Sequence, residues 1–157
     1  MEPRYRPRSE DPFDWFLRIP NRLELMKPIR DLVGATCEYH GVEEEARQEI
    51  LLAVSEIVNN AIEHVQGKGD EGYHEVDLYF GIRDGLVVAR IVDEGEGGIS
   101  QSDFDGAARP ELDNDRGRGL FLIKAYVDEI SVSPVPGVGT EVRFSKKVNG
   151  AGAGGMP

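Results

Sequence analysis

A ten-residue stretch, SEIVNNAIEH from Ser55 to His64, carries several polar groups within an apolar helical pattern. At about 100° per residue, the polar side chains fall on one stripe of the helix, opposite the apolar ones. The polar stripe comprises Glu56, Asn59, Asn60, Glu63 and His64. Adjacent asparagines disfavour the middle of a helix, because their amides compete for backbone hydrogen bonds. The stripe is therefore either a solvated face or a chemical site, and this helix alone leaves both open.

Glu56 and Asn60 are four residues apart, so their side chains point the same way along the helix. An amide oxygen is a hard ligand that suits Mg²⁺, and a carboxylate can act as a general base. The pair could therefore help to hold a metal ion and accept a proton. His64 continues the row, but a single histidine is more often a hydrogen-bonded packing residue than a ligand.

A second polar cluster, VDEGEGG, ends an apolar segment at Asp93 and continues with Gly95 and Gly97. Glycines let a backbone approach a flat ligand closely, and a carboxylate at a strand end can accept a hydrogen bond from an exocyclic amine such as that of adenine. An acidic turn after a strand would account for the same residues without a ligand.

A third cluster, RGRGLFLI, places Gly117 and Gly119 immediately before a predicted helix. Free backbone N–H groups at a helix start can cradle an anion, and Arg116 or Arg118 can add a charge-assisted hydrogen bond. The cluster is not a Walker A loop, because no Gly-Lys-Ser or Gly-Lys-Thr follows it. Glycine-rich helix starts also occur without phosphate.

The elements that must position these clusters follow from the apolar pattern. Helices are predicted at 25–33, from 43 to the glycines at 67 and 69, and over 119–129. Strands are predicted over 15–20, 76–82, 86–93, 130–134 and 140–148. Asp84 and Gly85 form a two-residue turn between two of these strands. We expect an α+β fold: a two-layer sandwich with helices on one face of a mixed, mostly antiparallel sheet.

Composition limits the kind of protein this can be. A chain of 157 residues suits one domain, predicted over 15–148, with flexible ends at 1–14 and 149–157. A net charge of −11 disfavours non-specific contact with nucleic acid or anionic membranes. No apolar run reaches the length of a membrane span, and the single cysteine, Cys37, is expected to be core filler. We therefore expect a cytoplasmic protein.

The three clusters in this order resemble the N, G1 and G2 boxes of the GHKL ATPase superfamily, which includes histidine kinases, gyrase-type topoisomerases, Hsp90 chaperones and MutL. GVGT near the C-terminal end resembles the superfamily's final Gly-Thr element. Within the superfamily, AVSEIVNNAIEH and RGRGLFLIKAYVDEI are most similar to the bacterial anti-sigma factor serine/threonine kinases. The resemblance covers roughly residues 15 to 148 and implies the ATP-binding fold of that superfamily.

The resemblance also implies roles for individual residues. Glu56 would be the catalytic base, Asn60 the Mg²⁺ ligand, and Asp93 the acceptor for the adenine amine, with Thr140 supporting Asp93. The remaining positions implied to bind nucleotide are Gly95, Gly97, Arg116, Gly117, Gly119 and Leu120. The implied cofactors are ATP and Mg²⁺. Asn59 occupies a position that the motif does not fix.

For partners, the resemblance implies a sigma factor, an anti-sigma factor antagonist of the STAS type and a second copy of the chain, without direct contact to nucleic acid. Two alternatives stay open. One is the ATP-binding part of a histidine kinase, although no helical hairpin with a phosphoacceptor histidine precedes it and the segment between Gly98 and Gly117 is short. The other is a nucleotide-switched binding module that has lost catalysis.

Overall fold

A five-stranded antiparallel sheet forms one layer of the protein. The computed structural model describes residues 12–66, 74–95, 101–105 and 115–148. The strands are β1 (Trp15–Pro20), β2 (Glu75–Arg83), β3 (Leu86–Asp93), β4 (Glu129–Val135) and β5 (Gly139–Lys147). Their spatial order is β1-β2-β3-β5-β4, and each neighbouring pair is antiparallel. β3 is therefore the central strand, with β2 and β5 on its two sides.

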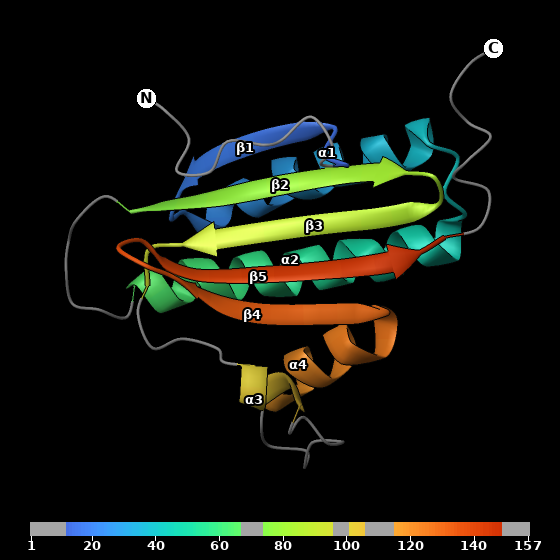
Figure 1. Ribbon diagram of the computed structural model, residues 1–157. Coiled ribbons are helices and arrows are strands. Elements are labelled where there is room, and N and C mark those ends of the chain that lie inside the picture. Colours follow the sequence, from blue (N-terminus) through green and yellow to red (C-terminus); the bar gives the residue numbers. More distant parts are fainter. Residues whose placement is uncertain (1–11, 67–73, 96–100, 106–114, 149–157) are drawn as a thin grey trace.

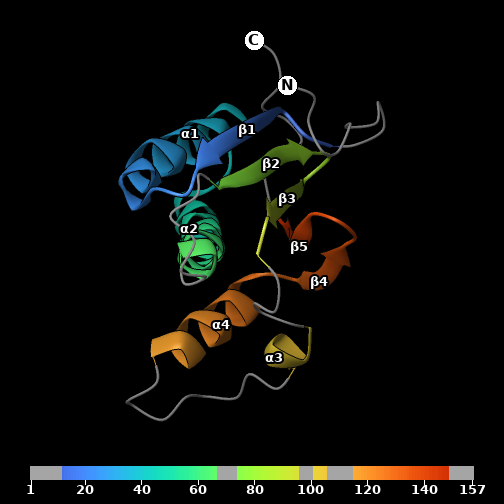
Figure 2. The same ribbon diagram turned by 90° about the vertical axis from the view of Figure 1, so that its left-hand side faces the viewer.

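Helices form the second layer. They are α1 (Met26–Tyr39), α2 (Glu44–Gln66), the short α3 (Gln101–Asp105) and α4 (Asp115–Tyr126), with a 3-10 turn at Leu23–Leu25. Figures 1 and 2 show α1, α2 and α4 on the same side of the sheet, with α2 behind its middle. The predicted α+β sandwich is confirmed. Among the described residues, no helix is long and apolar enough to cross a membrane.

The core lies between α2 and the central strands. The apolar stripe predicted for the α2 segment is buried, since Val54, Ile57, Val58 and Ala61 are each at most 4% exposed. On β2 the residues that alternate with polar ones, including Leu78 and Phe80, face this core. Because this apolar face packs on the sheet, the polar residues of α2 point away from the core. Among them, Glu56 and Asn60 are both only partly exposed.

Cys37 is fully buried in α1 and belongs to the same core, as predicted. Burial raises the pKa of its thiol to about 12. The side chain thus stays protonated at neutral pH and packs as a small apolar group.

The turn between β2 and β3 follows the sequence prediction. Asp84 and Gly85 both have positive φ, at 51° and 75°, which is the backbone conformation that a two-residue hairpin turn needs. The hairpin register follows from this turn, and it pairs Val76 with Asp93 at the far end.

The face of the sheet opposite the helices is also covered, at the position of β2. The ring of Tyr79 is fully buried and contacts the rings of Phe13 and Phe16. Beside it, a Cβ atom on Gly81 would lie 1.8 Å from the carbonyl oxygen of Pro12. The segment from Pro12 to Asp14 therefore lies directly on β2. The predicted domain limits, 15–148 with flexible ends, stay a prediction.

The start of α4 differs from the sequence prediction. The helix begins at Asp115, before the predicted start at Gly119, so that Gly117 also lies inside it. An acidic residue at the first helical position suits the positive end of the helix dipole, which offsets the poor helix propensity of two glycines. The helix ends at Tyr126, and Glu129, predicted as helical, begins β4.

Candidate functional site

The carboxyl end of β3 holds the first part of the candidate site. Asp93 is only 6% exposed, and its Oδ1 atom accepts a hydrogen bond of 2.7 Å from the backbone N–H of Gly95. This bond closes a tight turn directly after the strand. Because β3 is central, residues from β2 and β5 border the turn on both sides.

β5 supports the turn from one side. Thr140 pairs with Asp93 across the two strands, and its hydroxyl donates to the carbonyl oxygen of Gly95 at 3.2 Å. Thr140 thus supports the residue two positions after Asp93. Gly139 approaches even more closely, since a Cβ atom there would lie 2.1 Å from the carbonyl oxygen of Asp93. Only glycine lets the two backbones lie this close.

α2 and α4 form the second part of the site. A Cβ atom on Gly119 would lie 2.7 Å from Oε2 of Glu56, so the carboxylate rests against the glycine in α4. Asn60 lies one helical turn after Glu56 on α2. Figure 1 shows the C-terminal part of α2 at the same end of the sheet as the carboxyl end of β3. The structure thus brings the N-box and G2-box segments into direct contact.

The first turn of α4 offers backbone N–H groups. The first four N–H groups of a helix have no partner within it, and Gly117 is the third residue of α4. The N–H of Gly119, the fifth residue, falls within the range of the helix's own hydrogen bonds. Leu120 is buried and its side chain packs in the core with Ile123, so any contact it makes with a ligand would come from its backbone.

Several predicted positions give less information. Gly97 lies outside the described residues, as does the side chain of Arg116, although its backbone belongs to α4. The side chain of His64 is likewise outside them. On α2, Nδ2 of Asn59 lies 3.5 Å from Oε1 of Glu63.

The described residues contain no group of three or more His, Cys, Asp or Glu side chains that could hold a metal ion. Mg²⁺ at nucleotide sites commonly has one or two protein ligands and completes its shell with phosphate oxygens and water. The donor set of Asn60 with Glu56 nearby suits a site of that kind. At Gly119 and Gly139 the absence of a Cβ atom makes room for protein atoms, the carboxylate of Glu56 and the carbonyl oxygen of Asp93, so these two glycines bring the parts of the site together.

Sequence reasoning missed Glu94, the residue between Asp93 and Gly95. Its carboxylate accepts a hydrogen bond from the backbone N–H of Glu75 and contacts Nδ1 of His74, each at 3.2 Å. Sequence reasoning also assigned no separate role to Gly139. The sequence signal for Glu94 was the hairpin turn at Asp84 and Gly85. This turn sets the β2–β3 register, and extending that register brings residues 75 and 94 opposite each other.

Comparisons with known proteins agree with this geometry. The family model of the histidine kinase-like ATPase domain matches residues 19–146. The serine-protein kinase RsbW of Oceanobacillus iheyensis is 28% identical over 130 residues, which cover 78% of this chain and 80% of the relative. RsbW of Bacillus subtilis is 27% identical over 144 residues, 85% of each chain.

An anti-sigma F factor of Oceanobacillus iheyensis is 33% identical over 107 residues, which cover 64% of this chain and 69% of the relative. Among solved structures, the RsbU and RsbW domains of Rv1364c from Mycobacterium tuberculosis match with a TM-score of 0.57 and 20% identity. That match covers 85% of this chain but only 32% of the other, and it supports the fold.

Proposed function

Because the chain belongs to the histidine kinase-like ATPase domain family, we propose that it is an ATP-dependent serine/threonine protein kinase that also acts as an anti-sigma factor. It sequesters a sigma factor and phosphorylates an antagonist protein of the STAS type on serine or threonine. The observation that carries the proposal is the contact between Glu56 and Gly119, which sets a carboxylate beside the helix start that would hold the transferred phosphate.

The turn after β3 binds the base. Asp93 accepts a hydrogen bond from the exocyclic amine of adenine, while the bond from Gly95 N–H holds its carboxylate in place. Gly95 and Gly97 let the backbone lie close to the nucleotide, Gly139 lets β5 lie against the Asp93 turn, and Thr140 fixes the carbonyl of Gly95.

The start of α4 and the polar stripe of α2 bind the phosphates. ATP would supply the phosphoryl group, and a bound Mg²⁺ would neutralise the charge of its phosphates. Asn60 would give an amide oxygen to the metal, Gly117 and Arg116 would give donors to the phosphate oxygens, and Gly119 leaves room for the carboxylate of Glu56 beside them. Glu56 accepts the proton of the attacking serine or threonine hydroxyl at a carboxylate oxygen. These tasks of positioning and charge stabilisation account for most of the catalysis in phosphoryl transfer.

The names of the relatives, which are serine-protein kinases and an anti-sigma factor, support a sigma factor and its antagonist as partners. The chain binds a sigma factor and an antagonist, acts as a homodimer and makes no direct contact with nucleic acid. Its net charge of −11 favours a partner surface with basic residues. We propose a cytoplasmic location, since sigma factors act there.

A transfer assay tests the proposal. The purified chain is mixed with ATP labelled at its γ-phosphate, Mg²⁺ and candidate antagonists, and phosphoserine is located by mass spectrometry. We expect transfer to one serine or threonine, and sigma-factor binding by the same preparation. Transfer to the chain's own histidines would favour a histidine kinase, and nucleotide binding without transfer would favour a binding module.

Gly119→Ala is expected to separate stability from catalysis. Alanine should stabilise α4 by about 1 kcal/mol relative to glycine. Its methyl group would nevertheless meet the carboxylate of Glu56 and displace it. Phosphoryl transfer should then fall by about 10-fold or more, since a shift near 1 Å at a reacting group can cost about 100-fold. Thermal unfolding and the transfer assay measure the two effects.

Gly34→Ala is the matched control, because it changes a helical glycine of α1 whose added Cβ would meet Leu51 at an ordinary 4.0 Å. It should gain similar stability and keep the full transfer rate. If Gly119→Ala also kept the full rate, the position of Glu56 against α4 would have no part in catalysis.

A further inference from the structure

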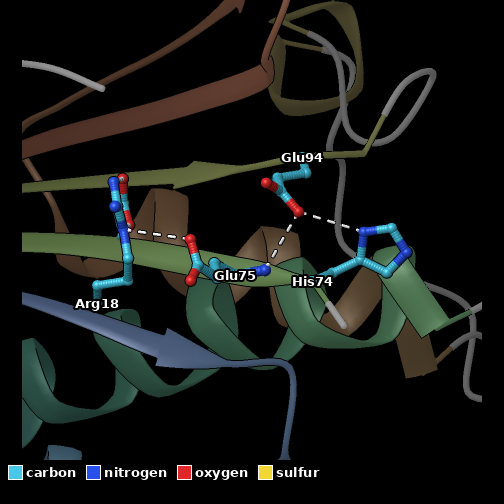
Figure 3. A network of polar contacts seen from close by, with 5 residues as sticks. Arg18, His74, Glu75 and Glu94 are labelled. Carbon is cyan, nitrogen blue, oxygen red and sulfur yellow. Dashed lines mark hydrogen bonds and ion pairs between the residues drawn. The ribbon is translucent and has the colours of Figure 1, made fainter. Parts of the chain in front are cut away.

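The carboxylate of Glu94 ties the turn after β3 to the start of β2. Oε2 accepts the backbone N–H of Glu75 and contacts Nδ1 of His74, each at 3.2 Å. Figure 3 shows the side chain of Glu94 reaching from the end of β3 to these two residues. The side chain is only 24% exposed, so the contacts are partly shielded from water.

This contact replaces a backbone pair of the sheet. The β2–β3 register ends with Val76 opposite Asp93, and continuing it would place Glu75 opposite Glu94. The chain instead turns away after Asp93, and the Glu94 carboxylate accepts the N–H of Glu75. Satisfying this donor lets β3 leave the sheet immediately after Asp93 without a buried unpaired group.

The start of β2, to which Glu94 is bound, is itself linked to β1 by ion pairs. The side chain of Glu75 is 8% exposed and lies 3.4 Å from Nε of Arg18, and Arg18 also bonds Asp77 at 2.7 Å. The hydrogen bond with Asp77 is the largest cause of a raised pKa for Arg18. This links β1 to β2 beside the turn, as Figure 3 shows. Glu94 therefore binds to a part of the sheet that three charged side chains hold in register.

The turn is thus held on both sides. Glu94 holds it to β2, while Thr140 and the close approach of Gly139 hold it to β5. Asp93 immediately precedes the attached residues Glu94 and Gly95, and its carboxylate must face the base at a defined angle. A shift of the turn would change this angle without altering the phosphate-binding start of α4.

We propose that Glu94 is a positioning residue that sets the selectivity for adenine by holding the Asp93 turn to β2. The inference rests on the proposed function, and its effect acts on the base rather than on the phosphates. Inosine triphosphate carries a carbonyl where ATP carries the 6-amino group, so the Asp93 carboxylate should favour ATP over inosine triphosphate. Loosening the turn should weaken that preference.

Calorimetry with ATP and with inosine triphosphate, both with Mg²⁺, tests the proposal on the full chain. Glu94→Ala should weaken ATP binding by about tenfold, the equivalent of one hydrogen bond to a charged acceptor, and leave inosine triphosphate binding unchanged. Glu94→Gln keeps an acceptor oxygen for the N–H of Glu75 and should retain most of the preference. Hydrogen exchange at the amides of Glu75 and Gly95 should quicken in Glu94→Ala without any nucleotide.

Glu129→Ala is the matched control, since it removes an exposed glutamate at the start of β4. It should leave both affinities unchanged. If Glu94→Ala does not fold, His74→Ala removes one partner of the carboxylate and should lower the preference in the same direction.

The outcomes separate this inference from the proposed function. An unchanged ratio of the two affinities in folded Glu94→Ala, or in His74→Ala where the first does not fold, would overturn the role of Glu94 alone. A wild-type chain that binds no ATP, or binds both nucleotides equally, would overturn the proposed adenine site and this inference with it.

Discussion

Glu56→Gln is expected to lower phosphoryl transfer by about 100-fold or more while ATP affinity and sigma-factor binding stay close to those of the wild type. Glutamine has nearly the same shape and helix propensity as glutamate, and the apolar face of α2 remains buried. The amide lacks the basic oxygen that accepts the proton of the attacking hydroxyl. Transfer to the antagonist, nucleotide calorimetry and a sigma-factor pull-down measure the three properties separately.

Glu63→Gln is the matched control, since Glu63 lies on the same polar stripe and is exposed. It should transfer phosphate at the wild-type rate. A full rate in Glu56→Gln would eliminate Glu56 as the base and leave it a structural or metal-holding role. Loss of ATP binding together with transfer would place Glu56 in the nucleotide site without base catalysis.

Asp93→Asn is expected to weaken ATP binding by at least about 100-fold, because a site built to pair with a substrate amine rejects a mismatched group strongly. The geometry makes the effect large. Oδ1 of Asp93 already accepts the N–H of Gly95 at 2.7 Å. An asparagine that keeps this bond must turn its NH₂ group toward the adenine amine, so two donors would face each other. Calorimetry with ATP and Mg²⁺ measures the loss.

Asp31→Asn is the control for the loss of one carboxylate, since Asp31 is exposed on α1 and forms an exposed ion pair with Lys27, one helical turn earlier. Its ATP affinity should match that of the wild type. Thermal unfolding should show that Asp93→Asn remains folded. If a folded Asp93→Asn bound ATP with unchanged affinity, Asp93 would serve the turn and not the ligand.

The spacing of apolar residues predicted the two layers, because burying one face of a helix or strand imposes that spacing. The apolar stripe of α2 and the apolar residues that alternate along β2 match the faces that pack in the core, although the intervening residues of β2, such as Asp77 and Tyr79, are buried too. Asp84 with Gly85 leaves little choice of turn. These are local patterns, which a sequence states directly. The start of α4 was misplaced because two glycines indicate a helix boundary, while the actual boundary is set by where the whole segment packs.

The candidate site was predictable in its members but not in its contacts. The approach of Gly119 to Glu56 joins residues 63 positions apart, and no local pattern encodes how α4 packs on α2. Glu94 was missed for another reason, because a glutamate after a strand is an ordinary surface residue. Its role follows only when the register set by Asp84 and Gly85 is extended past Val76 and Asp93. A side chain that replaces a backbone pair leaves no periodic signal.

The burial of Cys37 offers a route to observing α4 in solution. Cys37 is the only cysteine in the sequence, its side chain is fully buried, and its thiol is protonated at neutral pH. Because maleimides react with accessible thiolates, they should leave the native chain unlabelled. Ala125 is exposed on α4, so Ala125→Cys would accept a single fluorophore there. The emission of that fluorophore during titration with ATP would report the movement of α4 alone.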